Sequence, residues 1–216
     1  MKVLVIAPHP DDEVLGCGAT IKKLSDKGHK VNLMVITKAY EPDWSKEMLE
    51  SRPKKVKESC RLLGISEVQF LNFDTAKTDL IPIKDLSKKI FEASKALAPE
   101  MVFIPFWGDA HQDHQTVSKA AIVAFRPVSS KVKEILAYEV LSETEWGIEG
   151  FKPTIYSVVS RAELECKKQA MGAYFDELKK APHPRSLEII EALAKKRGSE
   201  VLSDYAEAFV SVRRFL

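Results

Sequence analysis

The chain has 216 residues, 45% of them hydrophobic, and a formal net charge of +2. This composition is typical of a globular protein and excludes an intrinsically disordered chain. A net charge this close to zero creates no strong positive potential that would attract the phosphates of a nucleic acid. We therefore expect no nucleic acid among the partners. The length fits a single domain over residues 1–216.

Short apolar runs alternate with amphipathic stretches along the whole chain. The predicted strands are 2–7, 31–37, 68–73, 101–106, 135–141 and 155–159. The predicted helices are 12–27, 46–63, 83–97, 113–125, 162–179 and 186–197. Nearly continuous apolar strands, most of them followed by a helix, predict an α/β fold with a doubly wound, mostly parallel, Rossmann-like sheet and helices on both faces. Ligands of such sheets bind beyond the carboxyl ends of the strands.

The first apolar run and the cysteines predict the compartment. Residues 3–7 are too few for a signal peptide or a membrane span, so we expect no membrane among the partners. Cys17, Cys60 and Cys166 are widely spaced and form no CxxC pair, which argues against a disulfide framework or a thiolate metal site. These features predict a reduced, cytoplasmic protein.

The first strand ends in a cluster of polar residues. Ala7-Pro8-His9-Pro10-Asp11-Asp12-Glu13 holds a histidine between two prolines, directly before three acids that open the next helix. Acidic residues favour a helix N-terminus, and helix capping accounts for one or two of them. Capping does not account for a histidine whose backbone is restricted by proline on both sides.

The fourth strand leads into a second polar cluster, Asp109-Ala110-His111-Gln112-Asp113-His114. His111 and His114 are spaced i, i+3, as are His9 and Asp12 in the first cluster, so each pair can point the same way on a helical turn. Imidazole and carboxylate ligands without thiolate favour a catalytic zinc site with one open position. The spacing does not choose between Asp11 and Asp12, or between His111 and His114, as ligands.

The two clusters resemble motifs of the PIG-L/LmbE-like zinc N-deacetylases. Ala7 to Glu13 is similar to the AHPDDE signature of that family, and His111 to His114 to its HxDH motif. Further similarity at 183–186, 197–198 and 205–209 extends the resemblance over nearly the whole chain.

The resemblance implies a role for each matching residue. It implies that His9, Asp12 and His114 bind one Zn²⁺ per chain and that Asp11 is the general base. His111 would polarise the substrate carbonyl or stabilise the oxyanion, and Asp113 would keep His111 oriented and charged.

Residues outside the two motifs give weaker indications of substrate contact. Arg52 fits the start of the family's second helix and could reach substrate hydroxyls or an anionic group, or could be a solvated helix charge. Lys55 stands where the family usually has glutamate. Tyr205 could approach the oxyanion or simply pack. Trp107 is the first candidate among the tryptophans for stacking on a sugar, although packing in the core or an interface is favoured. His183 and Arg185 could line the mouth of the site, although a loop surface is favoured.

The implied function is hydrolysis of the acetyl group of an N-acetylated amino sugar or glycoside, an N-acetylglucosamine derivative, by metal-activated water. Three alternatives remain: a deacylase of a thiol-glycoside or antibiotic-type amide, a metal-dependent sugar-binding protein without turnover, and a Mg²⁺-dependent phosphoryl hydrolase. The intact Asp11 argues against a pure binder, and the two imidazoles argue against magnesium. We also expect a homo-oligomer, a trimer or hexamer, from the resemblance and from the apolar stretch 148–155.

Overall fold

The strands lie in one mixed sheet. They are β1 (Lys2–Ala7), β2 (Lys30–Lys38), β3 (Glu67–Asp74), β4 (Met101–Pro105), β5 (Glu134–Tyr138), β6 (Ile155–Val158) and β7 (Ala206–Arg214). In this computed structural model, which describes residues 1–215, the sheet has seven strands in the order β3-β2-β1-β4-β5-β7-β6. The first five strands pair in parallel, and β7 lies antiparallel between β5 and β6. The predicted fold class is confirmed.

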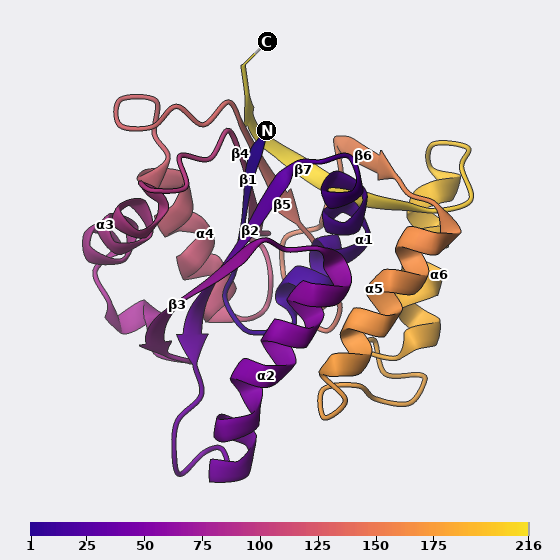
Figure 1. Ribbon diagram of the computed structural model, residues 1–216, viewed down its shortest axis with the longest axis horizontal. Helices are drawn as coiled ribbons and strands as arrows, with labels where there is room; N and C mark the ends of the chain where they lie inside the picture. Colours follow the sequence, from indigo (N-terminus) through magenta and orange to yellow (C-terminus); the bar gives the residue numbers. More distant parts are fainter. Residues whose placement is uncertain (216) are drawn as a thin grey trace.

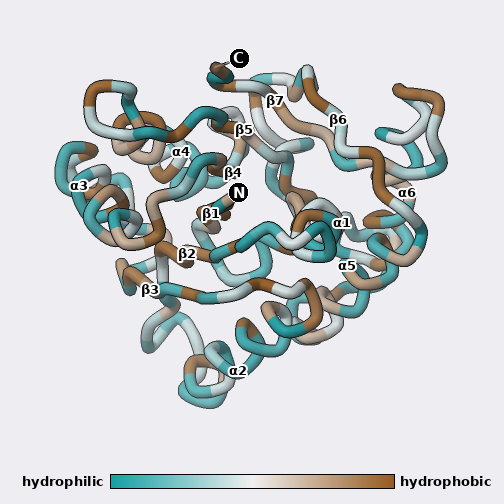
Figure 2. Tube along the Cα trace, turned by 45° about the horizontal axis from the view of Figure 1, so that its top comes forward, coloured by the Kyte–Doolittle hydropathy of each residue, from teal (hydrophilic) through white to brown (hydrophobic). Residues whose placement is uncertain are grey.

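Helices cover both faces of the sheet, as Figure 1 shows. They are α1 (Asp12–Asp26), α2 (Lys46–Leu63), α3 (Ile83–Ser94), α4 (Gln112–Ala124), α5 (Arg161–Ala173) and α6 (Leu187–Ser199), with a short 3₁₀ turn at Thr78–Leu80. The first core packs α1, α2, α5 and α6 against one face, and the second packs α3 and α4 against the other. Figure 2 shows α2 largely hydrophilic along its length, so only a narrow stripe of that helix is buried.

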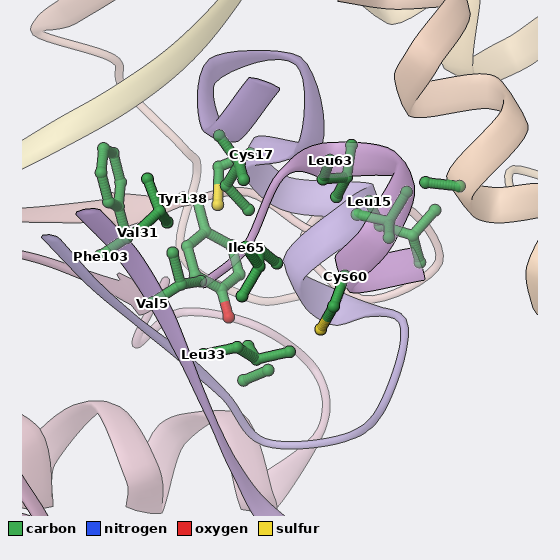
Figure 3. Packing of buried hydrophobic residues seen from close by; sticks show 14 of the residues in the cluster. Val5, Leu15, Cys17, Val31, Leu33, Cys60, Leu63, Ile65, Phe103 and Tyr138 are labelled. Atoms are coloured by element: carbon green, nitrogen blue, oxygen red, sulfur yellow. The ribbon is translucent and has the colours of Figure 1, made fainter. Parts of the chain in front are cut away.

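Close packing joins α1 to the sheet at Tyr138, which is fully buried in the first core (Figure 3). A β-carbon on Gly16 would lie 2.1 Å from the Tyr138 ring, so only glycine fits there without a shift. The Tyr138 hydroxyl donates to the backbone oxygen of Ile6 at 2.7 Å, which fixes the ring against β1.

Helix α1 is kinked at Cys17, where the backbone φ is −144°. Glu207 of β7 accepts hydrogen bonds from two backbone amides beside the kink, at 3.1 and 2.7 Å. Lys167 of α5 donates to the carbonyl of Leu15 at 2.8 Å and pairs with Glu207 at 2.7 Å, and both side chains are buried. These contacts hold the helix whose first residue is Asp12.

Two elements differ from those expected. β7 is absent from the predicted strands, because Phe209 interrupts the period-two alternation of its apolar residues at 206, 208, 210 and 212. α5 ends at Ala173 rather than at 179, so residues 174–186 form a connection that reaches the pocket described below. Within residues 1–215, no helix has both the length and the apolar composition needed to cross a membrane.

Candidate metal centre and active site

The two polar clusters meet at the point where the sheet changes winding direction. From β1 the chain proceeds to β2 and β3 on one side, whereas β4 and β5 lie on the other side of β1. The loops after β1 and β4 therefore diverge and leave a crevice between them, the usual ligand site of a doubly wound sheet. His9 and Asp12 follow β1, and His111 and His114 follow β4.

Three side chains converge in this crevice. His9 Nδ1, Asp12 Oδ2 and His114 Nε2 are separated from one another by 3.3 to 3.4 Å. Ligands of a tetrahedral zinc at ~2.0–2.1 Å from the metal lie about 3.3 Å apart, so this triangle has the size that such an ion requires. His9, Asp12 and His114 are thus a candidate metal site with three protein ligands.

The opposite nitrogen of each histidine ring bonds to a carboxylate. His9 Nε2 lies 2.9 Å from Asp113 Oδ2, and His114 Nδ1 lies 2.8 Å from Asp109 Oδ2. Such carboxylate–histidine pairs fix the tautomer and aim the free lone pair at a metal. The Asp113 carboxylate, expected to hold His111, instead faces His9 and accepts hydrogen bonds from residues 75–78, so Asp113 contacts the His111 ring through its backbone N–H.

The electrostatics of the centre favour a bound cation. Burial alone would lower the pKa of His114, but the charge of Asp12 and the hydrogen bond with Asp109 outweigh it and raise that pKa to about 10. The pKa of Asp12 lies well below its usual value despite burial, because of the charges and hydrogen bonds of the two histidines. The negative charge that raises the pKa of His114 would also stabilise a cation bound between these three side chains.

Asp11 lies beside the ligands and faces the pocket. Its backbone has a φ of 112°, in the left-handed region, and its N–H donates to Glu13 Oε2 at 3.0 Å. The Tyr174 hydroxyl donates to the other oxygen of Glu13 at 2.7 Å, which anchors this turn. Burial raises the pKa of Asp11 well above its usual value, although Arg185 Nη1, 3.3 Å from Oδ2, opposes the rise. Such a carboxyl group is suited to proton transfer.

His111 caps the N-terminus of α4 beside the metal site. Its Nδ1 accepts a hydrogen bond from the backbone N–H of Asp113 at 3.1 Å, so the neutral ring carries its hydrogen on Nε2. Burial and the neighbouring His9 and His114 lower its pKa to about 4. The charges of Asp113 and Asp12 raise this pKa but are outweighed, so the geometry favours a neutral His111 rather than the charged one expected.

A pocket of about 670 Å³ opens from His9, Asp11 and His111. One part of its wall is aromatic and apolar and is formed by Tyr40, Trp44, Leu49, Pro53 and Phe70. Tyr40 and Trp44 meet edge to face with ring centroids 5.6 Å apart. Trp44 rather than Trp107 therefore faces the pocket, because Trp107 packs beside Phe106 in the second core.

The remaining candidates for substrate contact differ in their position relative to the pocket. Arg52 lines the pocket, with Nη2 3.0 Å from Glu177 Oε1. Lys55 pairs with Asp176 at 2.8 Å, away from the metal ligands. Tyr205 is absent from the pocket wall within residues 1–215, and its carbonyl accepts from Val159 at the start of β7.

Sequence reasoning gave no role to two residues of the site, Asp109 and Glu177, and left the role of Arg185 open. Asp109 stands in the second cluster, and its acidic side chain five residues before a histidine was the available signal. Glu177 falls in a region predicted to be helical, and for Arg185 the sequence leaves open a place at the mouth of the site or on a loop surface. Glu177 carries no motif of its own, whereas Arg185 lies in the stretch 183–186 that resembles the family, and the fold of the connection 174–186 brings both residues to the pocket.

The sequence pattern of the GlcNAc-PI de-N-acetylase family, PIG-L, matches residues 4–125. The chain belongs to this family. The match includes both metal clusters and ends at the C-terminus of α4, whereas Glu177 and Arg185 lie beyond it.

Relatives that are named as deacetylases support this assignment. The uncharacterized deacetylase YaiS of Escherichia coli is 28% identical over 78% of this chain and 88% of its own. A probable N-acetyl-α-D-glucosaminyl L-malate deacetylase 2 of Bacillus cereus is 24% identical over 80% of this chain and 81% of its own. The structure of N,N′-diacetylchitobiose deacetylase from Pyrococcus horikoshii superposes with a TM-score of 0.78 and 26% identity, covering 97% of this chain and 83% of that one.

Proposed function

We propose that this PIG-L family member is a zinc-dependent N-deacetylase that removes the acetyl group from an N-acetylglucosamine derivative and releases acetate. The supporting observation is the triangle of His9, Asp12 and His114, with Asp11 and His111 beside it at the end of an open pocket. Two of the relatives are named for N-acetylated sugars, one as a probable N-acetyl-α-D-glucosaminyl L-malate deacetylase and one as a diacetylchitobiose deacetylase. We propose one Zn²⁺ per chain.

The centre is suited to amide hydrolysis. Zn²⁺ held by His9, Asp12 and His114 would supply a Lewis acid that brings the pKa of a water molecule to about 7. Asp11 accepts the proton of the attacking water and returns it to the departing amine. His111 donates from Nε2 to the carbonyl oxygen as negative charge develops there, and burial of the site strengthens that hydrogen bond.

The two neighbouring aspartates provide the test. Asp12→Asn replaces a charged ligand by an amide and should lower the zinc content of the purified protein. Asp11→Asn should keep zinc while kcat for acetate release from N,N′-diacetylchitobiose falls by about 10²–10⁴-fold, the usual contribution of a general base. Zinc is measured by elemental analysis and acetate by a coupled assay.

Three outcomes would contradict the proposal. If the zinc-loaded parent protein releases no acetate from N-acetylglucosamine, its oligomers or its glycosides, the sugar deacetylase function is wrong. If Asp11→Asn loses zinc while Asp12→Asn retains it, the two roles are exchanged. If Asp11→Asn stays within a few-fold of the parent rate, the proton goes to another group, with His111 the next candidate.

A further inference from the structure

Glu177 lies between two arginines in the wall of the pocket. Its Oε1 is 3.0 Å from Arg52 Nη2, and its Oε2 is 3.2 Å from Arg185 Nη1. The side chains of all three residues are between 16% and 20% exposed, so the ion pairs are only partly screened by water. One carboxylate thus occupies the position at which two guanidinium groups converge.

Other acids complete the neutralisation of the Arg185 guanidinium. Its Nη1 lies 3.3 Å from Asp11 Oδ2, and its Nη2 lies 3.5 Å from Glu143 Oε1. Its Nε donates to the Ser142 hydroxyl at 2.7 Å, so every side of the group has a partner. An anionic part of a substrate would have to displace Glu177 and would still face the neighbouring carboxylates.

The other charges of the pocket wall also disfavour an anionic substrate. The charged residues of its wall, histidines apart, are Lys38, Arg52 and Arg185 against Asp11, Glu41, Glu143 and Glu177. Lys38 and Glu41 are exposed to solvent, which leaves the two arginines as the basic groups available to a partly buried anion. Both are already paired with Glu177.

We propose that Glu177 is a specificity-determining residue that makes the pocket select an uncharged N-acetylated sugar and reject one bearing a carboxylate or phosphate. This inference rests on the proposed function for the reaction itself. Glu177 acts as a fixed internal anion, and its loss would leave Arg52 and Arg185 as an anion-binding pair. Proteins often gain specificity from a group that disfavours the wrong ligand, and here that group is the carboxylate that already pairs with both arginines.

Kinetics with two substrates test the proposal. We expect kcat/KM of the zinc-loaded protein to be at least about tenfold higher for N,N′-diacetylchitobiose than for N-acetylglucosamine 1-phosphate. Glu177→Gln keeps the size of the side chain and should reduce this ratio at least about tenfold, mainly by lowering KM for the phosphate. Glu41→Gln is the matched control, because it removes the same charge from the pocket wall without touching either arginine, and should change the ratio less than about threefold.

A binding measurement separates this inference from the proposed reaction. Calorimetric titration of the zinc-loaded proteins with inorganic phosphate should show at least about tenfold tighter binding to Glu177→Gln than to the parent. The double variant Arg52→Gln/Glu177→Gln should lose that gain, while any phosphate bound at zinc affects all three proteins alike. Equal phosphate affinity, or an unchanged substrate ratio in an active Glu177→Gln protein, overturns the role of Glu177. Absence of acetate release from both sugars overturns the proposed function instead, and the phosphate titration then decides the inference.

Discussion

The carboxylate of Asp109 fixes the ring of His114 from the side opposite the metal site. The residue is fully buried, and its second oxygen accepts from the Thr144 hydroxyl, so the group has little freedom to rotate. The imidazole is thereby aimed with Nε2 toward Asp12 and His9 before any metal arrives. Preorganisation of this kind lowers the cost of assembling a metal site.

Asp109→Asn should weaken zinc binding by about 10–100-fold, the usual effect of losing such a partner carboxylate. The amide is similar in size but has no charge to support the imidazole. Competition with a fluorescent zinc chelator measures the affinity, and Asp85→Asn, an exposed residue of α3, is the control. Affinity equal to that of the control would show that Asp109 is dispensable for metal binding.

At the scale of elements, α1 joins the metal centre to the rest of the fold. Its first residue is Asp12, its kink is held by Glu207 and Lys167, and Gly16 packs directly on the ring of Tyr138. Any displacement of α1 from the sheet therefore also displaces a proposed metal ligand.

Gly16→Ala should destabilise the protein by about 1–3 kcal/mol, because the new methyl group overlaps a ring that the surrounding core holds in place. For a chain of this size the melting temperature should fall by about 2–12 °C. Gly172→Ala in α5 is the matched control, since its β-carbon would meet nothing within 4 Å. That change should leave stability equal or raise it by about 0.5–1 kcal/mol. Equal melting temperatures for Gly16→Ala and the parent would show that α1 repacks.

The elements and the meeting of the two polar clusters were predictable for the same physical reason, whereas the choice of Asp12 and His114 as proposed ligands came from the family resemblance. Buried parallel strands are continuous apolar runs, and the polar residues that follow β1 and β4 necessarily meet at one edge of the sheet. The pairing of Asp113 with His9 was not predictable, because it depends on how two strand-to-helix junctions rotate toward each other. Glu177 and Arg185 depend on the path of an irregular connection, which carries no periodic signal.

At the scale of the whole molecule, the predicted homo-oligomer is still to be tested. Trp146 is 60% exposed and Ile148 is fully exposed in the connection between β5 and β6. Phe151 of the same connection packs toward the second core, so only part of the apolar stretch 148–155 is free for a partner.

We expect light scattering at micromolar concentration to give the mass of a trimer or hexamer. Ile148→Glu should lower that mass if this connection lies at the subunit interface, since burying an unpaired charge is costly. Val128→Glu changes another exposed apolar residue, between α4 and β5, and is the control. A parent protein with the mass of a monomer would contradict the predicted trimer or hexamer.

The position of β7 between β5 and β6 has a consequence for synthesis on the ribosome. β5 and β6 emerge first and present unpaired edges until β7 is made, because neither pairs with the other in the sheet. At ~5–20 residues per second, the roughly 70 residues from the end of β5 to the start of β7 take about 4–14 s to translate. During that interval a nascent chain holds both metal clusters but lacks Glu207, the clamp on α1. Zinc that reaches the protein so early would meet ligands whose helix is not yet anchored, and exposed strand edges would be open to other nascent chains.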